Sequence, residues 1–222
     1  MRATQAFDES VFRSLYCLRI VLQSATVRDS RTKAETVEKL ERFLTCDEIK
    51  LRVDQIGADI SRDFSSQTVV LIGVLKGAAI FLADLARAIS LDCTFDFITV
   101  SSYGMDHKSS GTVRLVQDIS QEIKGKNIVL VEDILDTGVT LWFVKNLLLT
   151  RQPSMLKTVT LLDKPSRRLQ EFEADYVGFT IPDQFVVGYG MDAGERYRNL
   201  PEIYRMTPDG SMPSNESSKL LP

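Results

Sequence analysis

One stretch of this 222-residue chain, residues 127–141, constrains its fold more than any other. It begins with an apolar, β-branched run at residues 128–131, which predicts a strand buried on both faces, as in a parallel sheet. Acidic residues follow directly, and a Thr-Gly turn then leads into an apolar pattern with helical spacing. This order of strand, acidic turn and helix predicts an α/β fold with polar groups gathered at the carboxyl end of a strand.

The acidic turn has a chemical interpretation. Its carboxylates, Glu132, Asp133 and Asp136, repel one another and need sugar hydroxyls, a metal ion or a protonated base to balance them. Residues 137–140 place backbone N–H groups at the start of a helix, where the helix dipole favours a phosphate. These groups together predict a sugar-phosphate site. The alternative is a loop that only caps its helix, but capping needs one acid or hydroxyl rather than this series.

Composition narrows the class of protein. The chain is 44% hydrophobic and 26% charged, which suits a single α/β domain with a sizeable core. Its net charge of −3 argues against a broad basic surface for binding nucleic acid. No apolar run approaches the ~20 residues that a helix needs to cross a bilayer. Three dispersed cysteines and a single histidine argue against a zinc site and favour reduced thiols, hence a cytoplasmic location.

The ends of the chain are predicted to differ from the middle. We expect residues 1–45 to form an N-terminal arm that packs on the domain or on a sister subunit; a partly disordered leader or a transit peptide is the alternative, and the acidic residues there argue against the latter. A domain is expected over residues 46–206, opened by a helix with Asp47 as its N-cap. Residues 207–222, rich in Pro, Ser and Gly, predict a disordered tail.

Further strands are expected on both sides of the central stretch. Residues 69–75 read as a second buried strand, and Lys76-Gly77 then precedes a helix, which makes a second place for a phosphate to bind. Residues 94–100 and 113–116 predict a hairpin whose Gly/Ser-rich tip is mobile. Another short strand is expected at residues 157–162.

Residues 131–140 resemble the phosphoribosyl pyrophosphate (PRPP) motif of type I phosphoribosyltransferases, and their Glu-Asp-Ile-x-Asp-Thr-Gly form is most similar to the hypoxanthine-guanine branch. The likeness extends over roughly residues 46–205, with five segments in the order of the family. These segments are Leu75-Lys76-Gly77, Ser102-Tyr103-Gly104, Glu132 to Thr140, Asp163-Lys164-Pro165 and Phe185 to Arg198. Two features depart from the short bacterial form of the family: the N-terminal arm, and Ala193-Gly194 beside Asp192.

The resemblance implies the type I phosphoribosyltransferase fold, a mainly parallel central sheet flanked by helices. It also implies a small hood subdomain built from the flanking N-terminal and C-terminal segments, and a homodimer or homotetramer. A flexible lid loop would begin at Ser102, Tyr103 and Gly104 and close over the site during reaction.

The same resemblance assigns the groups that bind PRPP. Glu132 and Asp133 would hold the ribose hydroxyls directly or through Mg²⁺, and Asp192 matches the family's ligand of a second metal on the pyrophosphate side. The residues expected at the 5′-phosphate are Asp136, Thr137, Gly138, Val139 and Thr140. Those expected at the pyrophosphate are Leu75, Lys76, Gly77 and Arg198, with a cis peptide bond before the lysine.

A base pocket is implied over residues 163–198. In it, Lys164 would donate to the 6-oxo group of a purine, Phe185 would stack on the ring, and Val186 would present backbone groups to its edge, with Asp192 nearby. Asp136 would exchange a proton with purine N7 and is the expected catalytic residue.

The activity that the resemblance implies is Mg²⁺-dependent transfer of the phosphoribosyl group from PRPP to hypoxanthine or guanine, which forms IMP or GMP in purine salvage. Alternatives remain open from the residues: transfer to xanthine, uracil or orotate, a PRPP-sensing regulator that binds RNA, or a receiver-like domain. The regulator needs a basic face, which the net charge of −3 does not favour. The receiver-like domain leaves the Thr-Gly-x-Thr turn unexplained.

Overall fold

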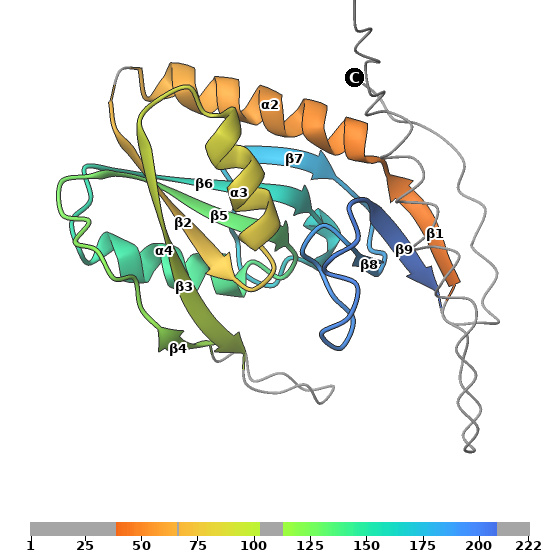
Figure 1. Cartoon of the computed structure of the whole chain (residues 1–222). Helices are drawn as coiled ribbons and strands as arrows, with labels where there is room; N and C mark the ends of the chain where they lie inside the picture. Colours follow the sequence, from red (N-terminus) through yellow and green to blue (C-terminus); the bar gives the residue numbers. More distant parts are fainter. Residues whose placement is uncertain (1–38, 66, 103–112, 208–222) are drawn as a thin grey trace, which may run out of the picture. The chain divides into compact units, whose positions relative to one another are not determined.

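The structure, a computed structural model, describes residues 39–65, 67–102 and 113–207. Its main feature is a six-stranded sheet in the order β4-β3-β2-β5-β6-β7 (Figure 1). Five neighbouring strands run parallel, and β4 pairs with β3 in the antiparallel sense, as the hairpin prediction requires. The strands are β2 (Val69–Leu75), β3 (Cys93–Ser102), β4 (Val113–Gln117), β5 (Asn127–Leu135), β6 (Met155–Asp163) and β7 (Tyr176–Thr180). The predicted mainly parallel sheet is confirmed.

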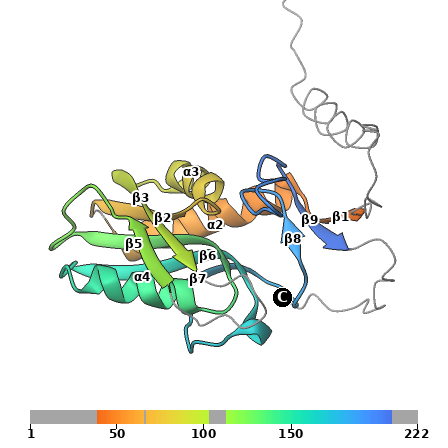
Figure 2. The same cartoon turned by 90° about the horizontal axis from the view of Figure 1, so that it is seen from below.

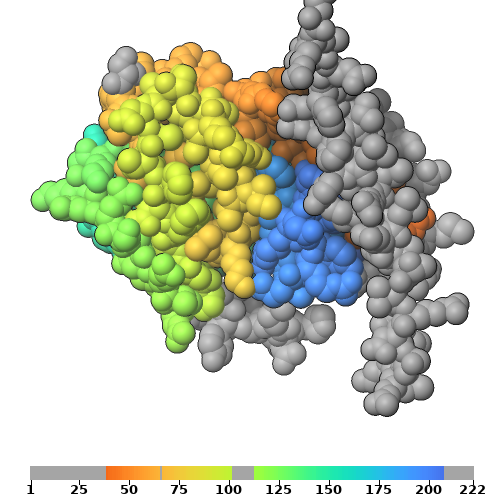
Figure 3. All heavy atoms as spheres, viewed as in Figure 1, coloured from red at the N-terminus to blue at the C-terminus, as the bar shows by residue number. Residues whose placement is uncertain are grey.

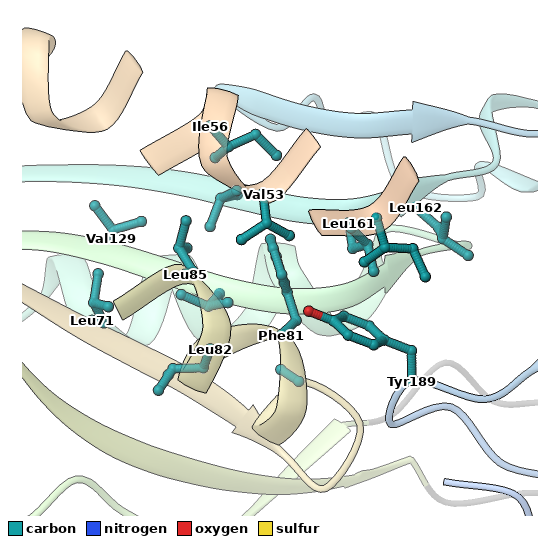
Figure 4. Close-up of a cluster of buried hydrophobic side chains, with 14 of the residues drawn as sticks. Val53, Ile56, Leu71, Phe81, Leu82, Leu85, Val129, Leu161, Leu162 and Tyr189 are labelled. Carbon is teal, nitrogen blue, oxygen red and sulfur yellow. The ribbon is translucent and has the colours of Figure 1, made fainter. Parts of the chain in front are cut away.

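Helices cover both faces of this sheet. Helices α2 (Cys46–Asp63) and α3 (Ala79–Ala88) lie on one face, and α4 (Val139–Leu149) lies on the other (Figure 2). Leu71 of β2 and Val129 of β5 pack into the core beneath α2 and α3, which Figure 4 shows. Their neighbours Ile72 and Leu130 point the opposite way and pack against α4. Because both faces are buried, residues 69–75 of β2 and 128–131 of β5 form unbroken runs without charged or polar side chains instead of alternating.

Helix α2 begins two residues earlier than the sequence suggested. Thr45, not Asp47, is the N-cap. The Thr45 hydroxyl accepts a hydrogen bond from the backbone N–H of Glu48, and the Glu48 carboxylate accepts one from the backbone N–H of Thr45 at 2.9 Å. This reciprocal capping box satisfies two N–H groups at once, which a single Asp cap does not do. Asp47 lies in the first turn, where its charge favours the helix dipole.

A second, three-stranded antiparallel sheet has the order β1-β9-β8 and corresponds to the expected hood. Its strands are β1 (Lys39–Leu44), β8 (Val186–Val187) and β9 (Ile203–Thr207). Strand β1 lies inside the segment that the sequence analysis assigned to the arm, and its pairing with β9 joins the two ends of the described chain. Residues 1–38 and 208–222, which include most of the predicted arm and tail, lie outside the described residues.

The hood is attached to the main sheet through the segment after β8. Tyr189 is buried, and its hydroxyl donates a hydrogen bond to Asp84 of α3 at 2.5 Å. Figure 4 places the Tyr189 ring beside Phe81 of the same helix. Next to it, Gly190 approaches the turn between β2 and α3 so closely that an added Cβ would lie 2.2 Å from the carbonyl oxygen of Gly77. In Figure 3 the blue C-terminal segment and the yellow segment of this turn lie side by side.

The direction of the parallel strands decides where a site forms. In Figure 1 the arrowheads of β5, β6 and β7 point toward the hood strands, so the loops at their carboxyl ends face the hood. Strand β5 is longer than predicted and includes Glu132 and Asp133, which the sequence analysis placed after the strand. None of the helices in the described part of the chain is both long and apolar enough to span a bilayer.

Candidate active site

The carboxyl end of β5 carries two adjacent acids in a poorly solvated position. Asp133 is buried, and Glu132 is partly exposed as a whole, although its Oε2 atom is shielded from solvent. Burial raises the pKa of Asp133 to about 6. Burial also raises the pKa of Glu132 well above its ordinary value, and the charge of Asp133 adds to the shift. Two carboxyl groups in such surroundings are poised to take up a cation or sugar hydroxyls.

The turn after β2 lies directly against these acids. A Cβ added to Gly77 would lie 2.0 Å from Oδ2 of Asp133, so only a glycine fits there without movement. The peptide bond between Leu75 and Lys76 is cis, as the resemblance implied. Two segments separated by more than 50 residues in the sequence, which were predicted separately to bind pyrophosphate and ribose, therefore meet at a single point.

Charged side chains from the hood complete this end of the site. Lys76 Nζ lies 2.8 Å from Oε2 of Glu195, and one terminal nitrogen of the Arg198 guanidinium lies 2.8 Å from Oδ1 of Asp192. The other terminal nitrogen of Arg198 donates to the carbonyl of Gly190 at 2.8 Å. The expected pyrophosphate residues Lys76 and Arg198 and the expected metal ligand Asp192 are thus close together. In this structure the fork of Arg198 is shared between Asp192 and a backbone carbonyl.

The turn between β5 and α4 has the geometry of an anion site. Gly138 is the N-cap of α4 and adopts φ +82°, where a side chain is strained, and an added Cβ would lie 2.8 Å from the carbonyl oxygen of Gln170. Gly138 itself offers no side-chain cap, and the Val139 N–H makes only a long hydrogen bond of 3.5 Å to Oγ1 of Thr137. The hydroxyls of Thr137 and Thr140 flank the same turn. A phosphate is the group that this end of a helix favours.

The other end of the site lies between Asp136 and Lys164. Lys164 is 6% exposed, and its ammonium forms no hydrogen bond or ion pair with any residue that the structure describes. Burial lowers the pKa of Lys164, although the nearby carboxylates of Asp136 and Asp183 oppose the shift. The side chain is largely buried while its Nζ remains accessible to solvent, so this ammonium can donate to a ligand oxygen. Asp136 lies within its electrostatic reach, as a base pocket requires.

Two arginines that follow Lys164 hold this loop in place, and the sequence analysis gave them no role. Arg167 donates from Nε to Oδ1 of Asp136 at 3.1 Å. Arg168 donates to the carbonyls of Leu135 and Asp136 and to the carboxylate of Asp163, so it ties the end of β6 to the acidic turn. Its side chain is 16% exposed, which makes these contacts less accessible to water than surface pairs. The adjacent Arg-Arg pair that follows Lys164-Pro165-Ser166 is the signal that was available in the sequence.

The structure describes some of the remaining predicted residues and not others. Phe185 is 55% exposed and precedes β8, while Val186 is buried within that edge strand. An aromatic side chain left this exposed has a free face for a planar ligand. Ser102 ends β3, whereas Tyr103 and Gly104 of the predicted lid lie outside the described residues.

The acids fit Mg²⁺ only in combination with a substrate. Oε2 of Glu132 is buried without a hydrogen-bond partner, so it is available to a ligand hydroxyl or a cation. Across residues 39–65, 67–102 and 113–207, however, no group of three or more His, Cys, Asp or Glu side chains is arranged to hold a metal alone. Mg²⁺ is commonly bound by one or two carboxylates together with substrate phosphates and water. The donors present suit an ion that binds together with a pyrophosphate-containing substrate.

These buried acids lead to a stability prediction. Replacement of Glu132 by Gln should raise the Tm of the ligand-free protein at pH 7.5. The pKa of Glu132 is raised in the folded state, so ionisation at this pH costs folding free energy; one pKa unit is worth about 1.4 kcal/mol, or roughly 2–4 °C of Tm for a chain of this size.

The gain should shrink as the pH falls through 4.5, the ordinary pKa of this carboxyl group, and disappear below it, where Glu132 is protonated in both states. Thermal unfolding at several pH values measures this trend. A variant that is less stable than the parent at pH 7.5 would contradict it.

Comparison with known proteins identifies the family. Residues 39–193 match the phosphoribosyl transferase domain family. A hypoxanthine-guanine phosphoribosyltransferase of Aquifex aeolicus is 48% identical over 168 residues, which are 75% of this chain and 94% of that protein. One from Bacillus subtilis is 45% identical over 172 residues, 78% of this chain and 94% of that protein.

A solved structure agrees with these sequence relatives. The crystal structure of a hypoxanthine-guanine phosphoribosyltransferase from Bacillus anthracis is 47% identical and has a TM-score of 0.72. The match covers 74% of this chain and 97% of that chain. These matches span nearly the whole length of the relatives. The chain therefore belongs to the phosphoribosyltransferase family, within its hypoxanthine-guanine branch.

Proposed function

We propose that this protein transfers the 5-phosphoribosyl group from PRPP to hypoxanthine or guanine, forming IMP or GMP and releasing pyrophosphate in purine salvage. The observation that carries the proposal is the packing of Gly77 against Asp133 beside the α4 N-terminus. This contact brings the Lys76 turn against Asp133, one of the two acids that we propose bind ribose, on the strand that leads into the turn proposed for the 5′-phosphate. The family comparisons favour this activity over the regulator and the receiver-like domain.

The substrate would lie along the carboxyl ends of the strands. Its pyrophosphate would face Lys76 and Arg198, and its ribose hydroxyls would face Glu132 and Asp133. The 5′-phosphate would accept hydrogen bonds from backbone N–H groups of residues 137–140. This orientation leaves the anomeric carbon directed toward the base end of the site, where a planar heterocycle can approach it.

Charge drives the proposed reaction at the pyrophosphate end. The bond from the anomeric carbon to the pyrophosphate oxygen breaks as the purine nitrogen bonds to that carbon, and the ribose becomes positively charged in the transition state. Lys76 and Arg198 would stabilise the charge that develops on the leaving pyrophosphate. Mg²⁺, held by Glu132, Asp133 or Asp192 together with substrate oxygens, would supply further neutralisation of that charge.

At the base end the chain would control a proton and the tautomer of the purine. Asp136 would take the proton from purine N7 as N9 bonds to the ribose, while Arg167 holds its carboxylate in place. Lys164 would donate to the 6-oxo oxygen, and Phe185 would stack on the ring. Since hypoxanthine and guanine both carry this oxygen, the ammonium favours both over adenine.

We also propose a cytoplasmic homodimer or homotetramer that binds no nucleic acid. Size-exclusion chromatography with light scattering tests the oligomeric state.

Activity itself is tested by adding hypoxanthine, guanine, xanthine, adenine and uracil in turn to the enzyme with PRPP and Mg²⁺. Formation of IMP and GMP is the expected result. A protein that turns over only uracil, or that uses no base while it binds PRPP, would overturn the proposed function.

Lys164 provides a sharper test of base selectivity. Replacement by Gln should lower kcat/KM for hypoxanthine and reduce its advantage over adenine by about 10-fold, because an amide can donate to O6 but can also accept from a 6-amino group. The exposed Lys50 of α2, replaced in the same way, is the matched control and should leave the ratio unchanged. An unaltered ratio in the Lys164 variant would remove this residue from the base pocket.

A further inference from the structure

The two cations proposed for pyrophosphate already contact an anion from their own chain. Oε2 of Glu195 lies 2.8 Å from Nζ of Lys76, and Oε1 of the same carboxylate lies 3.5 Å from a guanidinium nitrogen of Arg198. The Glu195 side chain is exposed, so its carboxylate is charged at neutral pH like that of an ordinary surface glutamate. One carboxylate therefore bridges a lysine from the β2–α3 turn and an arginine from the hood.

The backbone holds Glu195 in this position. Its φ of +68° is uncommon for a residue with a side chain, and it follows Gly194 with φ +58°. The backbone N–H of Glu195 donates to Oδ2 of Asp192 at 2.7 Å. This hydrogen bond holds Glu195 against Asp192, the residue that the proposed function places next to the metal and pyrophosphate.

Pyrophosphate and the Glu195 carboxylate have the same chemistry toward these cations. Both are anions with several acceptor oxygens, and a bidentate guanidinium fork or an ammonium binds either of them. Lys76 and Glu195 are each 65% exposed, so a substrate can reach the pair and replace the carboxylate without first opening the core.

We propose that Glu195 sets the affinity of the pyrophosphate subsite by acting as an internal competitor. Its carboxylate occupies Lys76 and Arg198 in the free protein, is displaced by the pyrophosphate group of PRPP, and returns as pyrophosphate leaves. This inference rests on the proposed function for the identity of the ligand. It assigns Glu195 a role in lowering affinity, which is opposite to the role of the cations beside it.

The expected effect is moderate because the contacts are exposed. Exposed ion pairs are individually weak, so two of them together correspond to roughly a 3- to 10-fold change in affinity. Replacement of Glu195 by Gln should therefore lower the Kd for Mg²⁺-pyrophosphate, and the KM for PRPP, by about 3- to 10-fold. The KM for hypoxanthine should change by less than about 2-fold, since the carboxylate that is replaced contacts Lys76 and Arg198 and not Lys164, the residue proposed to bind the 6-oxo group.

Titration calorimetry with Mg²⁺-pyrophosphate measures the Kd, and initial rates measure both KM values. Asp54 on α2 provides the matched control, because its carboxylate lies 2.6 Å from Nζ of Lys50 in an exposed pair outside the site. Replacement of Asp54 by Asn should leave the Kd unchanged. A second variant, Glu195→Gly, removes the carboxylate and accommodates the positive φ, so it should reproduce the tighter binding if the Gln variant is unstable.

The possible results separate the two proposals. Weaker or unchanged pyrophosphate binding in both Glu195 variants would overturn the inference and show that Glu195 holds the cations in place or has no effect. A parent protein that binds Mg²⁺-pyrophosphate but transfers ribose to no purine would overturn the proposed function alone. In that case the comparison of pyrophosphate affinities still decides the role of Glu195.

Discussion

Replacement of Asp136 by Asn is expected to lower kcat by about 10²-fold or more, while PRPP still binds. The amide has the shape of the carboxylate and can keep one contact with Arg167, which donates to Oδ1 of Asp136 at 3.1 Å. It cannot accept a proton from purine N7 at neutral pH. The loss should therefore appear in the chemical step and not in the binding of the activated sugar.

Single-turnover rates and a calorimetric PRPP titration separate these two quantities. The matched control is Asp118→Asn, which also changes an aspartate paired with an arginine: Oδ2 of Asp118 lies 2.7 Å from a guanidinium nitrogen of Arg151, outside the site. The control should retain the parent rate. An Asp136 variant that binds PRPP and turns over as fast as the parent would show that another group carries the proton.

A similarly large loss is expected when Gly77 is replaced by Ala. The new Cβ would lie 2.0 Å from Oδ2 and 2.5 Å from Cγ of Asp133, closer than atoms can approach. Asp133 is a short side chain on a buried strand, and Gly190 presses on the same turn, so the Lys76 turn itself must shift. Displacement of catalytic groups by about 1 Å can cost about 10²-fold, and we expect kcat/KM for PRPP to fall by that factor or more.

The crowding in the Gly77→Ala variant should also lower its stability. A second glycine, Gly57, separates the loss of activity from the loss of stability. An alanine Cβ at Gly57 of α2 would lie 2.7 Å from atoms of Ala88, so Gly57→Ala should lower the Tm as well. Its kinetic constants for PRPP should stay within about 2-fold of the parent, because the crowding is between two helices and not in the site. Parent-like kinetics in the Gly77 variant would mean that the turn adapts without loss.

The local pattern of the sequence was sufficient to predict the strands of the parallel core. Unbroken apolar runs predicted β2 and the first part of β5, and the acids, glycines and threonines that follow indicated a sugar phosphate at the strand ends. These features are readable because secondary-structure periods and turn residues depend on near neighbours in the chain. The predicted N-cap at Asp47 was wrong for the same kind of local reason, since a stronger capping box at Thr45 precedes it.

What brings the site together depends on residues far apart in the chain. Lys76 and Glu195 are separated by 119 positions, and β1 finds its partner only at β9. The position of Arg168 beneath the acidic turn likewise depends on the return of the chain after β6. Sequence determined which elements form and which chemistry their ends carry, because that information is local. Tertiary structure alone decided which charges meet, because contact between distant residues follows from strand order and packing.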